Sequence, residues 1–132
     1  MATITGAHHV AFTVRDIERS QAWYAGVLGL QLLLDRDDET TRVRVMAHPS
    51  GWIIGLRQHL GQDNGGPFSE FRTGLDHLAL TVGSKSELDE WEATLTEHAV
   101  TFTPAKETPI GTVIAFRDLD NIALELWLPL GS

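Results

Sequence analysis

Three side chains of the 132-residue chain are of types that bind metal ions, and two of them recur in matching surroundings. His9 opens the string HVAFTV at residues 9–14, and His77 opens the similar string HLALTV at residues 77–82. Glu125 stands between two leucines in the string IALELWLP. A strand can be apolar for structural reasons alone. Those reasons do not repeat a histidine at the same place in two strings that are 68 residues apart.

Strand alternation predicts that these three side chains point away from the apolar core. Successive side chains of a strand point to opposite faces, so the apolar residues beside His9 pack on a helix while His9 faces the other way. The same reasoning applies to His77 and Glu125. A buried carboxylate needs a partner, and two imidazoles with one carboxylate can share a divalent cation that keeps positions open for substrate. The pattern therefore predicts a site for Fe, Mn, Ni, Co or Zn on His9, His77 and Glu125.

A structural alternative for the same residues stays open at this level. The two histidines would then be hydrogen-bonded core residues, and Glu125 would pair with an arginine such as Arg44 or Arg57. The chain has no cysteine, which removes thiolate metal sites, cysteine nucleophiles and disulfides. Histidines and carboxylates are the metal ligands that remain.

The hydrophobic pattern predicts a βαβββ unit that occurs twice. In the first half, an apolar stripe with helical spacing follows Asp16, a suitable N-cap, and ends before Gly29, a suitable C-terminal glycine. Trp23 of this helix and Trp91 of the second expected helix are again 68 residues apart. The expected elements are residues 7–14, 17–28, 30–35, 42–48 and 52–59 in the first unit, and residues 76–82, 86–99, 100–104, 112–117 and 122–129 in the second.

The predicted fold class is α+β, with two tandem βαβββ modules whose sheets form a cup around the metal site. We expect a single domain over residues 1–132, with modules at about residues 5–60 and 75–130. The connector LGQDNGGPFSEFRTG, about residues 60–74, is long enough for a lid or a pocket wall, and is otherwise a plain crossover. The pattern fits a cup formed within one chain and a cup formed between two chains equally well.

Further side chains complete the predicted site. Strand parity allows Arg44 and Arg57 to face the cup, where they would hold an anionic group. His59 is a candidate general base. Solvated positions at a strand edge or a strand end are the alternative for these three. The residues expected to line the substrate pocket are Trp127, Gly55 and His48.

Composition narrows the class of protein. The net charge of −8 argues against general binding to the phosphate backbone of nucleic acids. The sequence shows no secretory leader and no apolar run of about 18 residues, so we expect a cytoplasmic protein without a membrane partner. The expected partners are a small-molecule substrate and a second copy of the chain, because open cups with apolar rims favour a homodimer.

Two stretches of the chain also resemble a known family. FTVRDIERSQAWYAGVLGL, from Phe12 to Leu30, is similar to the L-x-V-x-D-x-x-x-S-x-x-F-Y-x-x-x-L-G-L signature of the vicinal oxygen chelate superfamily, the glyoxalase, bleomycin-resistance and extradiol-dioxygenase group. FRDLDNIALEL is similar to its closing F-x-D-P-D-G-N-x-x-E-L segment, with Leu119 in place of proline and Asn121 in place of glycine. The resemblance implies two βαβββ modules around a metal, often in a homodimer. It places the family's metal ligands at His9, His77 and Glu125.

Departures from that family's patterns bear on the reaction. Glyoxalase I enzymes carry a fourth ligand where this chain has Gly55. Extradiol dioxygenases use a tyrosine near the substrate, but Tyr24 lies on the helix stripe and is expected in the core. Fosfomycin-resistance thiol transferases carry a threonine where this chain has Ala11. Members that sequester antibiotics usually lack the metal ligands.

The residues and the resemblance together favour a metalloenzyme over a binding protein. A divalent ion would bind a small oxygenated substrate and stabilise an enolate or another oxyanion. A glyoxalase-like lyase or isomerase is the preferred reaction class. The alternatives are a protein with a vestigial site that sequesters an antibiotic or a metabolite, and an Fe(II) dioxygenase of the extradiol type.

Overall fold

The computed structural model describes residues 1–131, and the chain divides into two compact units. Unit 1 comprises Met1–Gly66, and unit 2 begins at Pro67. The boundary falls inside the expected connector, so the second part of that connector belongs to unit 2.

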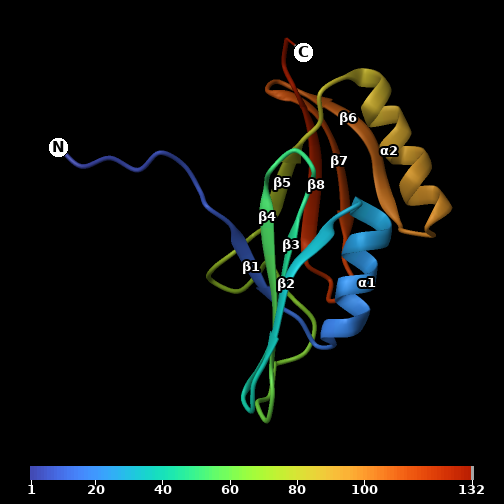
Figure 1. Cartoon of the computed structure of the whole chain (residues 1–132). Helices are drawn as coiled ribbons and strands as arrows, with labels where there is room; N and C mark the ends of the chain where they lie inside the picture. The colour runs from blue at the N-terminus through green and yellow to red at the C-terminus, as the bar shows by residue number, and fades with distance from the viewer. Residues whose placement is uncertain (132) are drawn as a thin grey trace. The chain divides into compact units, whose positions relative to one another are not determined.

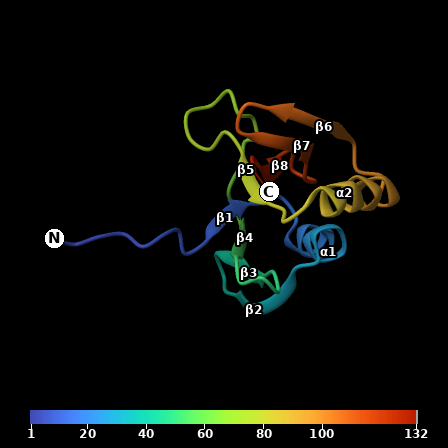
Figure 2. The same ribbon diagram turned by 90° about the horizontal axis from the view of Figure 1, so that it is seen from above.

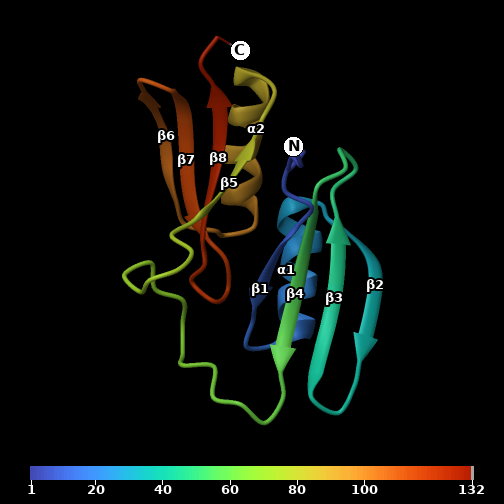
Figure 3. The same cartoon turned by 90° about the vertical axis from the view of Figure 1, so that its left-hand side faces the viewer.

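Each unit contains the expected βαβββ order, as Figure 1 shows. The elements of unit 1 are β1 (Val10–Thr13), α1 (Ile17–Leu28), β2 (Gln31–Asp37), β3 (Thr41–Ala47) and β4 (Ile53–His59). The elements of unit 2 are β5 (Leu78–Thr81), α2 (Lys85–Glu97), β6 (Phe102–Thr108), β7 (Gly111–Arg117) and β8 (Ala123–Pro129). The strand orders are β1-β4-β3-β2 and β5-β8-β7-β6, each with one parallel pair, β1 with β4 and β5 with β8 (Figure 3). The predicted α+β fold of two tandem modules is confirmed.

One helix covers one face of each sheet, as the view in Figure 2 shows. In unit 1 the buried residues on the helix-covered face include Phe12, Met46, Ile54 and Leu56. In unit 2 they include Ile114, Phe116, Leu124 and Leu126, which pack with Leu88 and Leu95 of α2. The opposite face of each sheet carries the alternate residues of the same strands, and we call it the open face. On the open face, Ala11 and Gly55 belong to unit 1, and Ala79, Glu125 and Trp127 belong to unit 2.

Helix α1 is held at both ends as the sequence predicts. The Asp16 side chain accepts a hydrogen bond from the Arg19 N–H at 3.2 Å, and Gly29 adopts the left-handed φ of 73° that ends many helices. A second acceptor comes from β4, because the Gln58 Oε1 accepts from the Ile17 N–H at 2.9 Å. The start of the helix is therefore fastened to the sheet that it covers.

Two strands are longer than the sequence predicts. Strand β2 runs to Asp37, and the turn that follows is organised by Asp38, whose side chain accepts from the N–H groups of Thr40 and Thr41. Strand β6 continues past Pro104, where the sequence suggests its end. It is an edge strand with a register shift between Thr103 and Lys106, and a bulge on an edge tolerates a proline.

The expectation that Arg44 lies on the open face is wrong. Arg44 shares its face of β3 with the buried Met46, and its Nε donates to Gln21 of α1 at 3.0 Å. Its guanidinium also pairs with Asp37 at 2.7 Å and lowers the pKa of that carboxyl. The long side chain reaches across the helix-covered face to polar partners at its edge, so strand parity alone misjudges it.

The hydrogen bond from Ile17 to Gln58 predicts a stability effect. Gln58→Leu removes the acceptor of a partly buried N–H, so the free energy of unfolding should fall by about 1–3 kcal/mol. Gln58→Glu keeps an oxygen at this position and should stay close to the parent. Urea unfolding of the three proteins measures the difference, and equal loss in both variants would contradict the role of the acceptor.

Candidate functional site

Unit 2 brings together two of the three predicted metal ligands. His77 immediately precedes β5, and Glu125 lies on the neighbouring strand β8. The His77 Nε2 is 3.1 Å from the Glu125 Oε1. An imidazole nitrogen and a carboxylate oxygen thus point at the same place on the open face, and these are atoms that bind divalent transition metals.

Within residues 1–131, Glu125 pairs with His77 and Trp127 and not with an arginine. The Trp127 indole N–H, two residues along β8, donates to the Glu125 Oε1 at 2.8 Å. The Glu125 side chain is 22% exposed, so its charge is partly removed from water. The partners are His77 and Trp127, whereas the structural alternative had Arg44 or Arg57. Trp127, predicted to line the pocket, is on the open face and acts on Glu125 directly.

The pair lies in a pocket of about 370 Å³ at one end of the unit 2 sheet. Asp76 is part of the lining, and its Oδ1 is 2.7 Å from the His77 Nδ1. Thr101 and the first two residues of β6, Phe102 and Thr103, form another part of the lining. The pocket therefore joins both ligands to polar groups on several elements of the unit.

A bidentate ion pair forms part of the lining of this pocket. Arg117 at the end of β7 donates to both carboxylate oxygens of Glu70, each at 2.9 Å, and also to the Asn121 carbonyl. The same connector segment is fixed by Phe68, which exchanges hydrogen bonds with Asp120 and Asn121. The Arg117 guanidinium lowers the pKa of Glu70 to about 2. The second part of the connector is thus a pocket wall, one of the two roles expected from its length.

In unit 1 the third predicted ligand, His9, immediately precedes β1 and is exposed. Its Nδ1 is 2.7 Å from the Nδ1 of His8. Within residues 1–131 no three histidine, aspartate or glutamate side chains form a group that could hold a metal ion. The structure therefore brings His77 and Glu125 together in unit 2, whereas His9 belongs to unit 1.

Gly55 faces Ala11 at the position where a fourth ligand was considered. The two residues are register partners on β4 and β1. A Cβ on residue 55 would lie 3.2 Å from the Ala11 Cβ, closer than ordinary contact. The two small residues therefore fit each other, and the open face of unit 1 carries neither a carboxylate nor a hydroxyl at this pair.

His59 and Arg57 lie on the open face but far along it from His9. Because Val10 pairs with Ile54, the level of His9 is that of Ile53, six residues from His59. At about 3.3 Å per residue this is roughly 20 Å, too far for proton transfer at a metal held by His9. Parity gives the face of His59 and not its height along the strand, so its role as a general base stays a prediction. Arg57 is four residues from that level, roughly 13 Å away.

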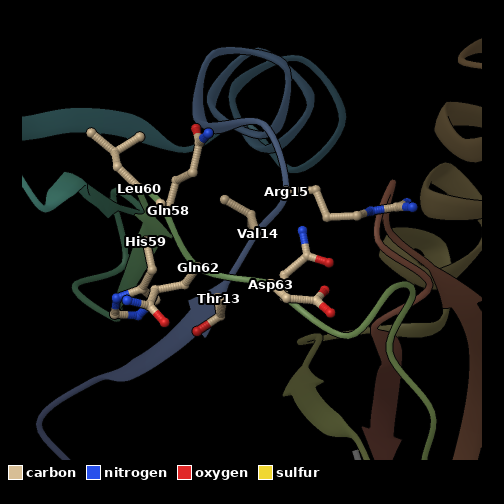
Figure 4. A pocket seen from close by; sticks show the side chains of 10 residues that line it. Thr13, Val14, Arg15, Gln58, His59, Leu60, Gln62 and Asp63 are labelled. Atoms are coloured by element: carbon tan, nitrogen blue, oxygen red, sulfur yellow. The ribbon is translucent and has the colours of Figure 1, made fainter.

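His59 instead lines a second pocket of about 590 Å³ at the other end of the unit 1 sheet. Figure 4 shows this pocket, formed by the ends of β1 and β4 and the first part of the connector. Thr13, Gln62 and Asp63 contribute polar side chains. Helix α1 begins beside it, where Gln58 already accepts the Ile17 N–H.

His48 does not stand in either of these pockets. Its ring stacks on Trp52 with centroids 5.5 Å apart and planes 11° apart, and its Nδ1 contacts the Ser50 hydroxyl at 2.7 Å. These contacts stabilise the turn between β3 and β4. The ring packs within this turn, and the placement of His48 in a substrate pocket stays a prediction.

Three residues of the unit 2 pocket were missed from the sequence: Asp76, Glu70 and Arg117. Asp76 stands directly before a predicted ligand, and this adjacency was an available signal. Glu70 and Arg117 are 47 residues apart, and no local pattern links them.

The chain belongs to the Glyoxalase/Bleomycin resistance protein/Dioxygenase superfamily, whose family model matches residues 6–126. A crystal structure of a glyoxylase/bleomycin resistance protein/dioxygenase domain from Frankia sp. EAN1pec is 41% identical, with a TM-score of 0.90. That match covers 96% of this chain and 99% of the Frankia chain. The predicted family is confirmed.

A metallothiol transferase is among the relatives of the chain, and a fosfomycin resistance protein shares its fold. The chain is 27% identical over 125 residues to the metallothiol transferase FosB of Staphylococcus epidermidis, covering 93% of this chain and 83% of FosB. FosX of Listeria monocytogenes shares the fold, with a TM-score of 0.77 at 19% identity, over 98% of this chain and 97% of FosX. Among the helices of residues 1–131, none is long and apolar enough to cross a membrane.

The departure of the closing motif from the family pattern has a local explanation. Asn121 adopts φ 67°, in the left-handed region where the motif usually has glycine. Asparagine is one of the few other residues that tolerate this conformation. The Asn121 side chain also donates to the Phe68 carbonyl at 3.0 Å, a contact that glycine could not make.

The ion pair between Glu70 and Arg117 predicts a pH dependence of stability. The folded pKa of Glu70, about 2, is below its ordinary value of 4.5, so the stabilising effect is complete above about pH 5 and declines as the pH falls toward 2. The difference in free energy of unfolding between the parent and Glu70→Gln should therefore be constant above about pH 5 and narrow below it. Urea unfolding from pH 6 to pH 3 measures this difference. A difference that does not change with pH would contradict the assigned ion pair.

Proposed function

We propose that the protein is a metalloenzyme in which His9, His77 and Glu125 bind one divalent ion. The observation that carries the proposal is the convergence of His77 and Glu125 at 3.1 Å in the unit 2 pocket. His9 stands at the equivalent position of the repeated unit and has the same residue type. The His9 ligand would come either from the same chain or from a second copy in a homodimer.

The residues of unit 2 fit a metal by their chemistry. Glu125 carries a charge in a partly buried position between apolar neighbours, and a cation there would offset that charge. The Trp127 N–H occupies the Oε1 of Glu125 from one side, which fixes the direction of the carboxylate. When bound, the ion supplies Lewis acidity, which stabilises negative charge on an oxygen of the substrate.

The pocket supports a small oxygenated substrate. Its volume of about 370 Å³ is within the range of small-ligand pockets, and Thr101 and Thr103 offer hydroxyl groups. Arg117 carries a positive charge, but this charge is paired with Glu70 through two hydrogen bonds. Apart from the two candidate ligands and Asp76, the lining therefore combines hydroxyl groups, apolar side chains and one compensated ion pair.

The reaction class is a proposal at a finer level. Lyase or isomerase chemistry of the glyoxalase type needs a bound metal that stabilises an oxyanion of the substrate. The pocket offers two candidate ligands for the metal and space for a small substrate. Thiol transfer is the second candidate, favoured by the metallothiol transferase FosB relatives. A structure of a FosX variant from Listeria monocytogenes, 19% identical, is complexed with Mn(II) and 1S,2S-dihydroxypropylphosphonic acid. Mn(II) and a phosphonate are therefore useful first probes.

An extradiol dioxygenase is less well supported. Tyr24, the only tyrosine of the chain, is 1% exposed on α1 and stacks edge-on with Trp23. A tyrosine in this position belongs to the core of unit 1 and is not available to a substrate. Fe(II) is still included among the metals tested, because bound iron would support the dioxygenase reaction.

Metal content is the test of the proposed site. The parent, purified without a polyhistidine tag or chelator, should contain about one transition-metal ion per chain by elemental analysis. His9→Ala, His77→Ala and Glu125→Ala should each lose most of it, because three protein ligands are the usual minimum for such a site.

His98→Ala is the matched control. His98 is an exposed histidine at the end of α2, and its Nδ1 contacts the Thr94 carbonyl, so its loss should leave the metal content unchanged. A parent without metal after incubation with Mn(II), Fe(II), Co(II), Ni(II) and Zn(II) would contradict the proposal. Full metal content in all three ligand variants would place any metal elsewhere.

A further inference from the structure

The residue directly before each candidate histidine ligand touches the same atom of that histidine. In unit 2 the Asp76 Oδ1 is 2.7 Å from the His77 Nδ1. In unit 1 the His8 Nδ1 is 2.7 Å from the His9 Nδ1. Asp76 and His8 are 68 residues apart, the same separation as the two ligands. The contact is therefore repeated together with the histidine.

We propose that Asp76 is a positioning residue that holds the proton of neutral His77 on Nδ1 and so presents the unprotonated Nε2 to the metal. The inference rests on the proposed function for its purpose, but the hydrogen bond exists without the metal. An ionised carboxylate only accepts hydrogen bonds, so the imidazole nitrogen that is hydrogen-bonded to Asp76 must carry the proton. The lone pair then lies on the other nitrogen, which is the one that faces Glu125.

Glu125 competes with Asp76 for the imidazole proton, and the geometry favours Asp76. The Nε2 of His77 is 3.1 Å from the Glu125 Oε1, a longer contact than the one to Asp76. The same Oε1 already accepts the Trp127 N–H at 2.8 Å. An oxygen that accepts one strong bond is a weaker acceptor for a second. The neutral ring therefore keeps its proton at Nδ1, on the side of Asp76.

The contact in unit 1 is chemically different from the one in unit 2. An imidazole can donate or accept at Nδ1, so the pairing of His8 with His9 permits either direction of the hydrogen bond. Only in unit 2 does the partner fix the tautomer. Carboxylates that bind the second nitrogen of a histidine ligand orient the ring and raise its basicity. Asp76 therefore makes His77 the better prepared of the two histidine ligands.

The decisive readout is the tautomer of His77 in the metal-free protein. Long-range ¹H–¹⁵N correlation spectra at about pH 9, where imidazoles of ordinary pKa are neutral, distinguish the two nitrogens directly. The parent should show His77 with its proton on Nδ1. Asp76→Ala should shift the population to Nε2, because Glu125 is then the remaining carboxylate beside the ring. Asp76→Asn keeps an oxygen acceptor and should restore much of the parent signal.

Metal affinity is the second readout. Asp76→Ala should weaken Mn(II) or Zn(II) binding by about 10- to 100-fold, and Asp76→Asn by less. The Asp76 side chain is 72% exposed, so neither variant should unfold the protein. Asp89→Ala is the matched control, since Asp89 is an exposed aspartate on α2 that pairs with Lys85. It should change neither the tautomer nor the affinity.

The two proposals can fail separately. If the parent binds no metal, the proposed function fails, while the spectra of the metal-free protein still test Asp76. If the parent binds metal through His77 but Asp76→Ala leaves both the tautomer and the affinity unchanged, the positioning role is overturned. A proton on Nε2 of His77 in the parent would overturn it as well.

Discussion

The alternation of side chains across the two sheets is the constraint on which the other features depend. Each sheet has one face covered by a helix, so every strand divides into residues that pack on that helix and residues that do not. On β8, Leu124 and Leu126 are buried, which forces Glu125 between them to the open face. Glu125 cannot change faces unless the whole strand turns over and exposes the two leucines. The position of the carboxylate is thus set by the packing of its neighbours.

The charge of Glu125 is what makes this position chemically significant. The Glu125 carboxylate is 22% exposed and contacts an indole N–H and an imidazole. These contacts compensate only part of the free energy lost when the carboxylate is removed from water. Asp76 binds the far side of the same imidazole. The His77 imidazole therefore links the exposed carboxylate of Asp76 to the partly buried carboxylate of Glu125. These three residues lie within unit 2 alone, and the second part of the connector contributes to the lining of their pocket through Glu70 and its partner Arg117.

The sequence predicted those features that follow from periodicity and failed where contacts are long-range. The repeated βαβββ order, the caps at Asp16 and Gly29, and the face of Glu125 all follow from local patterns. Arg44 was misplaced because its aliphatic stem allows a charged residue to share a face with Met46. His59 lies on the predicted face, but its height along the sheet does not follow from parity, because height depends on the register of β4 against β1. The role of Glu70 required knowledge of the fold, since its partner Arg117 is far along the chain.

The most direct measurement is anomalous X-ray diffraction from crystals of the metal-loaded protein, recorded at the absorption edge of the bound metal. The predicted result is one anomalous peak per chain at about 2.0–2.2 Å from a nitrogen of His9, the Nε2 of His77 and a carboxylate oxygen of Glu125. The same map shows whether His9 comes from the same chain or from a second copy. A peak that contacts none of these three residues, or no peak from protein saturated with metal, would contradict the proposed site.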